Sequence, residues 1–126
     1  TNTVYSYDTE FCDIAKDHID RIENVQYNVF NPLKSPDDRE LMLSESLISL
    51  DVDPHDGVQE REFYCFFVDN NWKGIMVCDD INVGPLGGMI SFWESVEKLK
   101  YNLINTTHSH HTGTGLICFD NQEVIF

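Results

Sequence analysis

Acidic side chains and a histidine follow a short apolar segment in the stretch SLISLDVDPHDG, residues 46–57. The apolar run LISL ends directly at Asp51, and Asp53, His55 and Asp56 follow within the next five positions. Like charges crowded at a strand end repel one another unless water, a helix N-terminus, a metal or a ligand compensates. The stretch is therefore a candidate site for cation binding or for acid–base chemistry.

A second acidic pair, Asp79 and Asp80, ends the apolar segment KGIMVC. If LISL and KGIMVC form neighbouring parallel strands, their carboxyl ends bring Asp51 beside this pair. Carboxylate oxygens suit Mg²⁺ or Ca²⁺, so the pattern predicts a metal site at Asp51, Asp79 and Asp80. His55 is then a ligand, a general base or an orienting group. The alternative is that these acids only cap turns and bind backbone amides.

Three histidines, His108, His110 and His111, lie in the stretch THSHHTGTG. Two histidines two residues apart on extended chain can chelate a transition metal, and a polar loop before the last strand is the alternative. The following Gly-Thr-Gly precedes an apolar strand, LICF, and not a helix, so it lacks the helix N-terminus that a phosphate-binding loop uses.

The elements that must position these residues are short apolar strands alternating with helical patterns. Strands are predicted at 3–7, 24–30, 47–50, 73–78 and 115–119, with a further candidate at 101–105. Helices are predicted at 9–22, 58–70 and 88–100, with a short one around Arg39–Leu43. The alternation predicts one α/β domain of 126 residues with a mostly parallel sheet and helices on both faces.

Charge and cysteine content restrict the classes of function. The net charge of −14 disfavours nucleic-acid binding through a basic face. The four cysteines form no CxxC pair, which favours buried free thiols in a reducing compartment. No apolar run approaches the ~18 residues of a membrane span, so we expect no membrane association and a cytoplasmic location.

The order of these motifs resembles that of the class I S-adenosylmethionine-dependent methyltransferases, most closely the small-molecule O-methyltransferases. The resemblance rests on D-x-D-x-H after a strand, then KGIMVCDDI, an FW-containing helix and TGTGLICF, and it extends from VYSYD to the last strand. It implies a Rossmann-like sheet whose last strand is antiparallel. It also implies methyl transfer to a hydroxyl of a small molecule or sugar, with S-adenosylmethionine and in some members Mg²⁺.

The same resemblance assigns roles to individual residues. Asp8 matches the acid that holds the cofactor ribose, and Phe30 and Asn31 fall near the adenine. Asp51 lies beside the methyl donor and on the metal, together with Asp79 and Asp80. His55 matches a base for the acceptor hydroxyl, although Pro54 alters the spacing between acid and histidine.

The family's first strand and glycine-rich loop would precede TNTVYSYD. We therefore expect a fold without its first βα unit. Either a preceding segment or another chain, such as a second copy, completes it, or the chain is a degenerate relative of the family. Two other functions stay open at this point. One is a non-catalytic oligomerisation or interaction module, and the other is a metal-dependent hydrolase that uses Asp51, Asp53, His55, Asp79 and His108.

Overall fold

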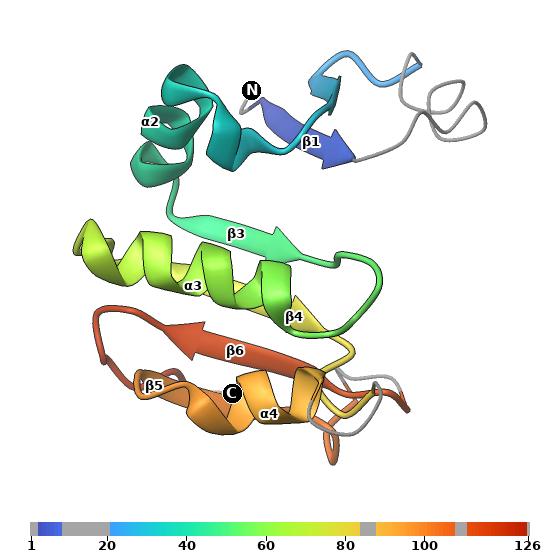
Figure 1. The fold of residues 1–126 in the computed structure, drawn as a ribbon, viewed down its shortest axis with the longest axis vertical. Helices are drawn as coiled ribbons and strands as arrows, with labels where there is room; N and C mark the ends of the chain where they lie inside the picture. Colours follow the sequence, from blue (N-terminus) through green and yellow to red (C-terminus); the bar gives the residue numbers. More distant parts are fainter. Residues whose placement is uncertain (1–2, 9–20, 84–87, 108–110, 126) are drawn as a thin grey trace. The chain divides into compact units, whose positions relative to one another are not determined.

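A computed structural model describes residues 3–8, 21–83, 88–107 and 111–125 (Figure 1). The chain divides into two compact units, Thr1–Leu41 and Met42–Phe126. Each unit has its own sheet.

The first unit contains two parallel strands, β1 (Val4–Asp8) and β2 (Val25–Val29), which pair from Val4 opposite Val25 to Asp8 opposite Val29. These are the strands predicted at 3–7 and 24–30. The helix predicted at 9–22 falls almost wholly outside the described residues, which exclude 9–20.

Local capping explains how the chain leaves β2. The Asn31 side chain accepts a hydrogen bond of 2.9 Å from the Leu33 N–H and so caps the 3₁₀ helix η1 (Pro32–Lys34). The α-helix α2 (Pro36–Ser44) follows. Within the first unit, the Tyr7 hydroxyl donates a 2.6 Å hydrogen bond to Asp38. Bonds from Ser35 and Tyr7 lower the pKa of the Asp38 carboxyl.

The second unit contains a four-stranded sheet in the order β3-β4-β6-β5. Its strands are β3 (Leu47–Leu50), β4 (Ile75–Asp79), β5 (Leu99–Asn102) and β6 (Thr114–Cys118). β3 and β4 are parallel, whereas β6 runs antiparallel to both β4 and β5. The predicted antiparallel last strand is therefore confirmed, but the sheet is mixed rather than mostly parallel in its pairing.

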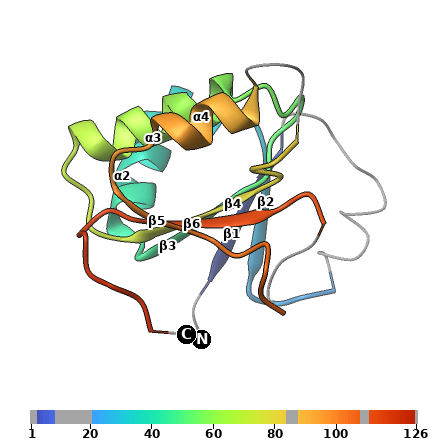
Figure 2. The same cartoon turned by 90° about the horizontal axis from the view of Figure 1, so that it is seen from below.

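Two helices, α3 (Val58–Asp69) and α4 (Met89–Ser95), cover one face of this sheet (Figure 2). The sequence predicts helices on both faces of the sheet, but α3 and α4 both lie on the same face (Figure 2). The core between helices and sheet is apolar and fully buried, and it includes Phe67, Met76, Phe92, Ile117 and Phe119. Each such side chain contributes about 1.5–3 kcal/mol by leaving water.

The prediction of one helix over 88–100 is wrong in its second half. The helix ends at Ser95, and Leu99–Asn102 pairs with β6 instead. Sheet pairing therefore overrides local helical preference here. The Lys100 ammonium donates to the carbonyl oxygens of Trp93 and Glu94, at 2.6 and 3.3 Å, and so satisfies acceptors at the end of α4.

The Gly-Thr-Gly of the last strand has a structural explanation. Gly113 has a φ of +90°, which L side chains rarely adopt. A Cβ at Gly115 would lie 2.5 Å from the Trp93 indole, so only glycine lets the ring pack on the strand. The packing of Trp93 thus accounts for Gly115, and the positive φ before the strand accounts for Gly113.

The cysteines are free thiols where the structure describes them, as predicted, but only Cys78 and Cys118 are buried, and Cys65 is exposed. Cys12 lies outside the described residues. Among the described segments, no helix has the length and apolar character needed to cross a bilayer.

One acid, Glu60 in the first turn of α3, is buried with only 2% of its surface exposed. Its carboxyl accepts hydrogen bonds from the backbone N–H groups of Glu60 itself and of Gly57, at the end of the helix where negative charge is favourable. Burial nevertheless raises its pKa. Burial, and secondarily the charge of Glu60, also raise the pKa of the Cys78 thiol to about 12.

The burial of Glu60 predicts a pH-dependent loss of stability. The folded protein holds the Glu60 proton to higher pH than the unfolded chain, so the contribution of Glu60 to the free energy of unfolding falls as pH rises above about 4.5. We expect Glu60→Gln to gain stability relative to the unaltered protein between pH 4 and pH 7, measured by urea unfolding. Glu62→Gln, an exposed position on the same helix, is the control. Curves for the Glu60 variant and the unaltered protein that stay parallel over this range would contradict the assignment.

Candidate functional site

The parallel pairing of β3 with β4 brings the strand-end acids together. Leu50, the last residue of β3, lies opposite Cys78. Asp51 therefore leaves its strand at the level where β4 ends in Asp79 and continues to Asp80. The predicted pairing of LISL with KGIMVC is confirmed, and with it the shared edge of carboxylates.

A short loop between β3 and α3 carries His55 back to this edge. The His55 N–H donates to the Val52 carbonyl oxygen at 3.3 Å, and the Gln59 side chain donates to the Asp53 carbonyl oxygen at 2.9 Å. His55 itself has a φ of +57°, a left-handed conformation that histidine, asparagine and aspartate tolerate better than most residues.

The end of the loop is anchored to helix α3. Asp56 accepts a 2.9 Å bond from the Val58 N–H, and Gly57 is the N-cap of the helix with a φ of +78°. A Cβ on Gly57 would lie 2.9 Å from both the Gly88 carbonyl oxygen and the Phe92 Cβ. Helix α3 thus begins in close contact with the start of α4, and this contact fixes where the preceding loop can run.

Asp51, His55 and Asp80 converge at the site. One ligand atom from each lies within 4.8 Å of the other two. The His55 Nε2 atom is 3.4 Å from the Asp80 Oδ2 atom and 3.0 Å from the Asp53 Oδ1 atom. The imidazole and the Asp80 carboxylate are half-buried, and Asp51 is exposed, so the group is open to solvent on the Asp51 side.

The site concentrates negative charge. Partial burial raises the pKa of Asp51, and the neighbouring charge of Asp79 raises it further. Asp80 and Asp53 act in the same direction, while His55 opposes them. A bound cation would relieve this repulsion, because it stabilises the ionised form of each carboxylate.

Asp79 is not in the group of three, although its metal role was predicted with that of Asp80. Its Oδ1 atom accepts a 3.0 Å hydrogen bond from the Asp80 N–H. Asp80 has a φ of +55°, so the backbone turns sharply immediately after β4. The adjacent acids Asp79 and Asp80 therefore have different positions, and only Asp80 is in the group. His55 supplies the third ligand atom, beside those of Asp51 and Asp80.

The predicted cofactor residues Asp8, Phe30 and Asn31 belong to the first unit. The Asp8 carboxylate accepts a 3.3 Å hydrogen bond from the Tyr27 hydroxyl, and the Phe30 ring meets the edge of Tyr7 with centroids 5.6 Å apart. Asn31 caps η1. Of the loop histidines, His108 and His110 lie outside the described residues, and His111 is exposed.

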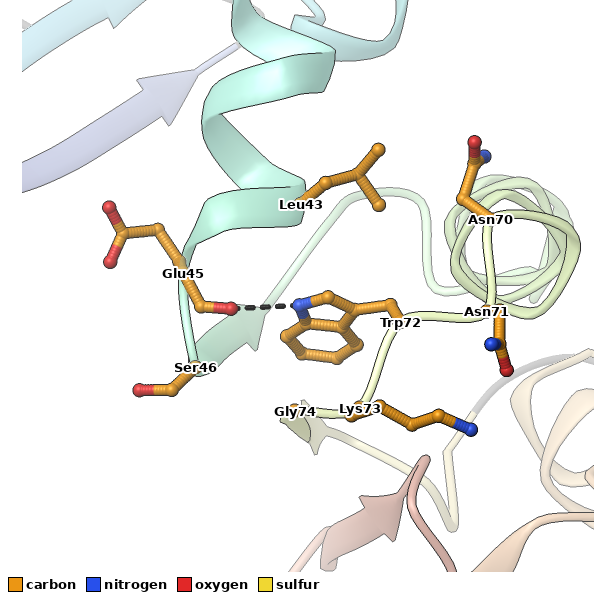
Figure 3. A pocket seen from close by; sticks show the side chains of 8 residues that line it. All are labelled: Leu43, Glu45, Ser46, Asn70, Asn71, Trp72, Lys73 and Gly74. Atoms are coloured by element: carbon orange, nitrogen blue, oxygen red, sulfur yellow. Dashed lines mark hydrogen bonds between the residues drawn. The ribbon is translucent and has the colours of Figure 1, made fainter.

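A surface pocket of about 390 Å³ lies at the opposite edge of the sheet (Figure 3). It is lined by Leu43, Glu45, Ser46, Asn70, Asn71, Trp72, Lys73 and Gly74. Ser46 directly precedes β3 and Gly74 directly precedes β4, so the pocket lies at the N-terminal ends of these strands. The length of the two strands therefore separates it from Asp51, His55 and Asp80, which lie at their C-terminal ends. The Trp72 indole N–H donates to the Glu45 carbonyl oxygen at 2.8 Å, which ties together two walls of the pocket. We assign the chemistry to the other end of these strands, where ligand atoms of Asp51, His55 and Asp80 converge, and we call this end of the sheet the acidic edge.

Comparison with protein-family models, with curated proteins and with solved structures gave no match in any of the three.

Gly57 provides a test of how the loop is held. Alanine there would place a Cβ in the contact with Gly88 and Phe92 and would force a positive φ on a residue that avoids it. We expect Gly57→Ala to lower the free energy of unfolding by more than about 1 kcal/mol in urea titrations. Val58→Ala, at an exposed neighbouring position, is expected to change it by less than about 0.5 kcal/mol. Equal effects would show that the close contact is not needed.

Asp51 provides a test of the charge repulsion. The raised pKa of Asp51 means that the folded state disfavours its ionised form. The protonated carboxyl therefore stabilises the fold at low pH, and this contribution is lost as the pH rises. At pH 7 a neutral residue at this position is preferable. We expect Asp51→Asn to raise the melting temperature at pH 7 in the absence of divalent cations. Glu97→Gln, an exposed acid between α4 and β5, controls for the loss of one charge. A melting temperature no higher than that of the control would refute the repulsion.

Proposed function

We propose that this chain belongs to a class I S-adenosylmethionine-dependent methyltransferase that methylates a hydroxyl of a small molecule or sugar. The observation that carries the proposal is the edge where Asp51 follows β3 and Asp79 and Asp80 follow at the end of parallel strand β4. Ligands of open α/β sheets bind at the carboxyl ends of the strands, which is where these acids lie.

The strand arrangement adds support. β6 lies between β4 and β5 and runs against both, while β3, β4 and β5 share one direction. The resemblance stated above implies such an antiparallel last strand. The first unit has a separate sheet of two parallel strands, and Asp8 ends the first of them, where the resemblance places the acid that binds ribose.

In the proposed reaction, the acceptor hydroxyl oxygen attacks the methyl carbon of the sulfonium donor. The carbon–sulfur bond breaks, its electron pair stays on sulfur, and S-adenosylhomocysteine leaves. The hydroxyl proton must pass to a base. A divalent cation on Asp51 and Asp80 would lower the pKa of the acceptor hydroxyl when bound.

Among the described residues, His55 supplies an imidazole at this edge, and it has two candidate roles. It can accept the proton of the acceptor, or it can bind the cation. The nitrogen that faces Asp80 cannot do both at once, because each role uses the same lone pair. The assignment of the acidic edge to methyl transfer is compatible with either role.

The proposal is tested by calorimetric titration of S-adenosylhomocysteine into the 126-residue chain, with and without Mg²⁺. We expect micromolar binding that weakens about tenfold or more in Asp8→Asn, because a charged acceptor of ribose hydroxyl bonds is lost. The asparagine oxygen can still accept the Tyr27 hydrogen bond, which protects the fold.

Asp37→Ala removes an exposed acid of the same unit and is the matched control. We expect it to bind S-adenosylhomocysteine as the unaltered chain does. Absence of binding by a chain that unfolds cooperatively in urea would count against the methyltransferase assignment, as would equal weakening by the two substitutions.

A further inference from the structure

The ligand atoms that converge at the acidic edge differ from those that the resemblance implies. The resemblance predicts three carboxylates, from Asp51, Asp79 and Asp80, around Mg²⁺. The structure groups two carboxylates with the imidazole of His55. Mg²⁺ favours oxygen ligands and holds water tightly, whereas imidazole nitrogen suits zinc, nickel, iron and copper ions.

The separation of the His55 and Asp80 ligand atoms is close to that of two neighbouring ligands of a coordinated dication. Ligand atoms at adjacent corners of an octahedron, each about 2.1 Å from the metal, lie about 3 Å apart. The His55 Nε2 and Asp80 Oδ2 atoms are 3.4 Å apart, and the Asp51 ligand atom lies within 4.8 Å of both. Asp51 is exposed and can adjust by rotation of its side chain.

The contact of His55 with Asp53 does not compete strongly with a metal. The two atoms are 3.0 Å apart, but the Asp53 side chain is 90% exposed. Ion pairs in contact with water contribute little, since solvent screens them and both side chains lose freedom. The imidazole therefore stays available, held at the site chiefly by the backbone of its loop.

We propose that Asp51, His55 and Asp80 bind a first-row transition-metal dication of the Mn²⁺–Zn²⁺ series in preference to Mg²⁺ and Ca²⁺. His55 is the residue that sets this preference. The inference deepens the proposed function, since the ion would act on the acceptor hydroxyl, but the binding of the ion requires no methyl donor. With its nitrogen on the metal, His55 is a ligand and not the proton acceptor.

The test uses Co²⁺, whose visible absorption reports nitrogen and oxygen ligation, and Mg²⁺ measured by calorimetry, both with the full 126-residue chain. We expect Co²⁺ to bind at least tenfold more tightly than Mg²⁺. His55→Asn replaces the imidazole by an amide oxygen, and asparagine tolerates the positive φ of this position. We expect this variant to bind Co²⁺ at least tenfold more weakly, with a changed spectrum, and Mg²⁺ within threefold of the unaltered chain.

The matched control is the triple substitution of His108, His110 and His111 by asparagine, which removes the other histidines near the C-terminus. We expect it to leave the Co²⁺ spectrum and affinity unchanged. Loss of Co²⁺ binding in the triple variant but not in His55→Asn would overturn the proposal. Equal affinity for Mg²⁺ and Co²⁺, or no binding of either ion by the folded chain, would also overturn it.

These outcomes are separable from failure of the proposed function. Binding of S-adenosylhomocysteine without binding of Co²⁺ would reject the transition-metal site and leave the methyltransferase assignment in place. Binding of Co²⁺ through His55 without binding of S-adenosylhomocysteine would support the metal site and count against the methyl donor.

Discussion

The parallel pairing of β3 with β4 is the constraint on which the candidate site depends. Its register, with Leu50 opposite Cys78, decides that Asp51 leaves one strand where Asp79 and Asp80 end the next. A shift of the register by one residue would exchange the buried and exposed faces of β3, and the core does not permit it. The packing of the apolar core therefore keeps the carboxylates of Asp51, Asp79 and Asp80 close together, although their charges repel one another.

The site combines this repulsion with an unusual backbone. His55 and Asp80 both adopt positive φ, and the Asp51 carboxyl has a raised pKa. Such features lower stability and persist where the surrounding structure enforces them, and they are concentrated at functional sites. Here the N-terminus of α3, closely packed through Gly57 against the start of α4, supplies that enforcement. A cation would turn the repulsion at this edge into attraction.

The antiparallel strand β6 connects the two halves of the larger sheet. It pairs with β4 on one side and β5 on the other, and the Trp93 indole packs on it at Gly115. The sheet is thereby extended beyond its parallel pair, and β4 is enclosed on both edges. The acids at the end of β4 thus stand on a strand that is paired on both sides, which suits a site that must hold its geometry.

The sequence by itself determined strands β1, β2, β3, β4 and β6, helix α3 and the acids at the strand ends, because these depend on local apolar periodicity and on abrupt transitions to charge. Only the tertiary structure decided that Leu99–Asn102 is a strand, since its pairing with β6 is a long-range contact. It also placed His55, rather than Asp79, with Asp51 and Asp80. Adjacent residues at a strand end point in different directions, and the turn at Asp80 and the loop to α3 are fixed by packing that no local pattern encodes.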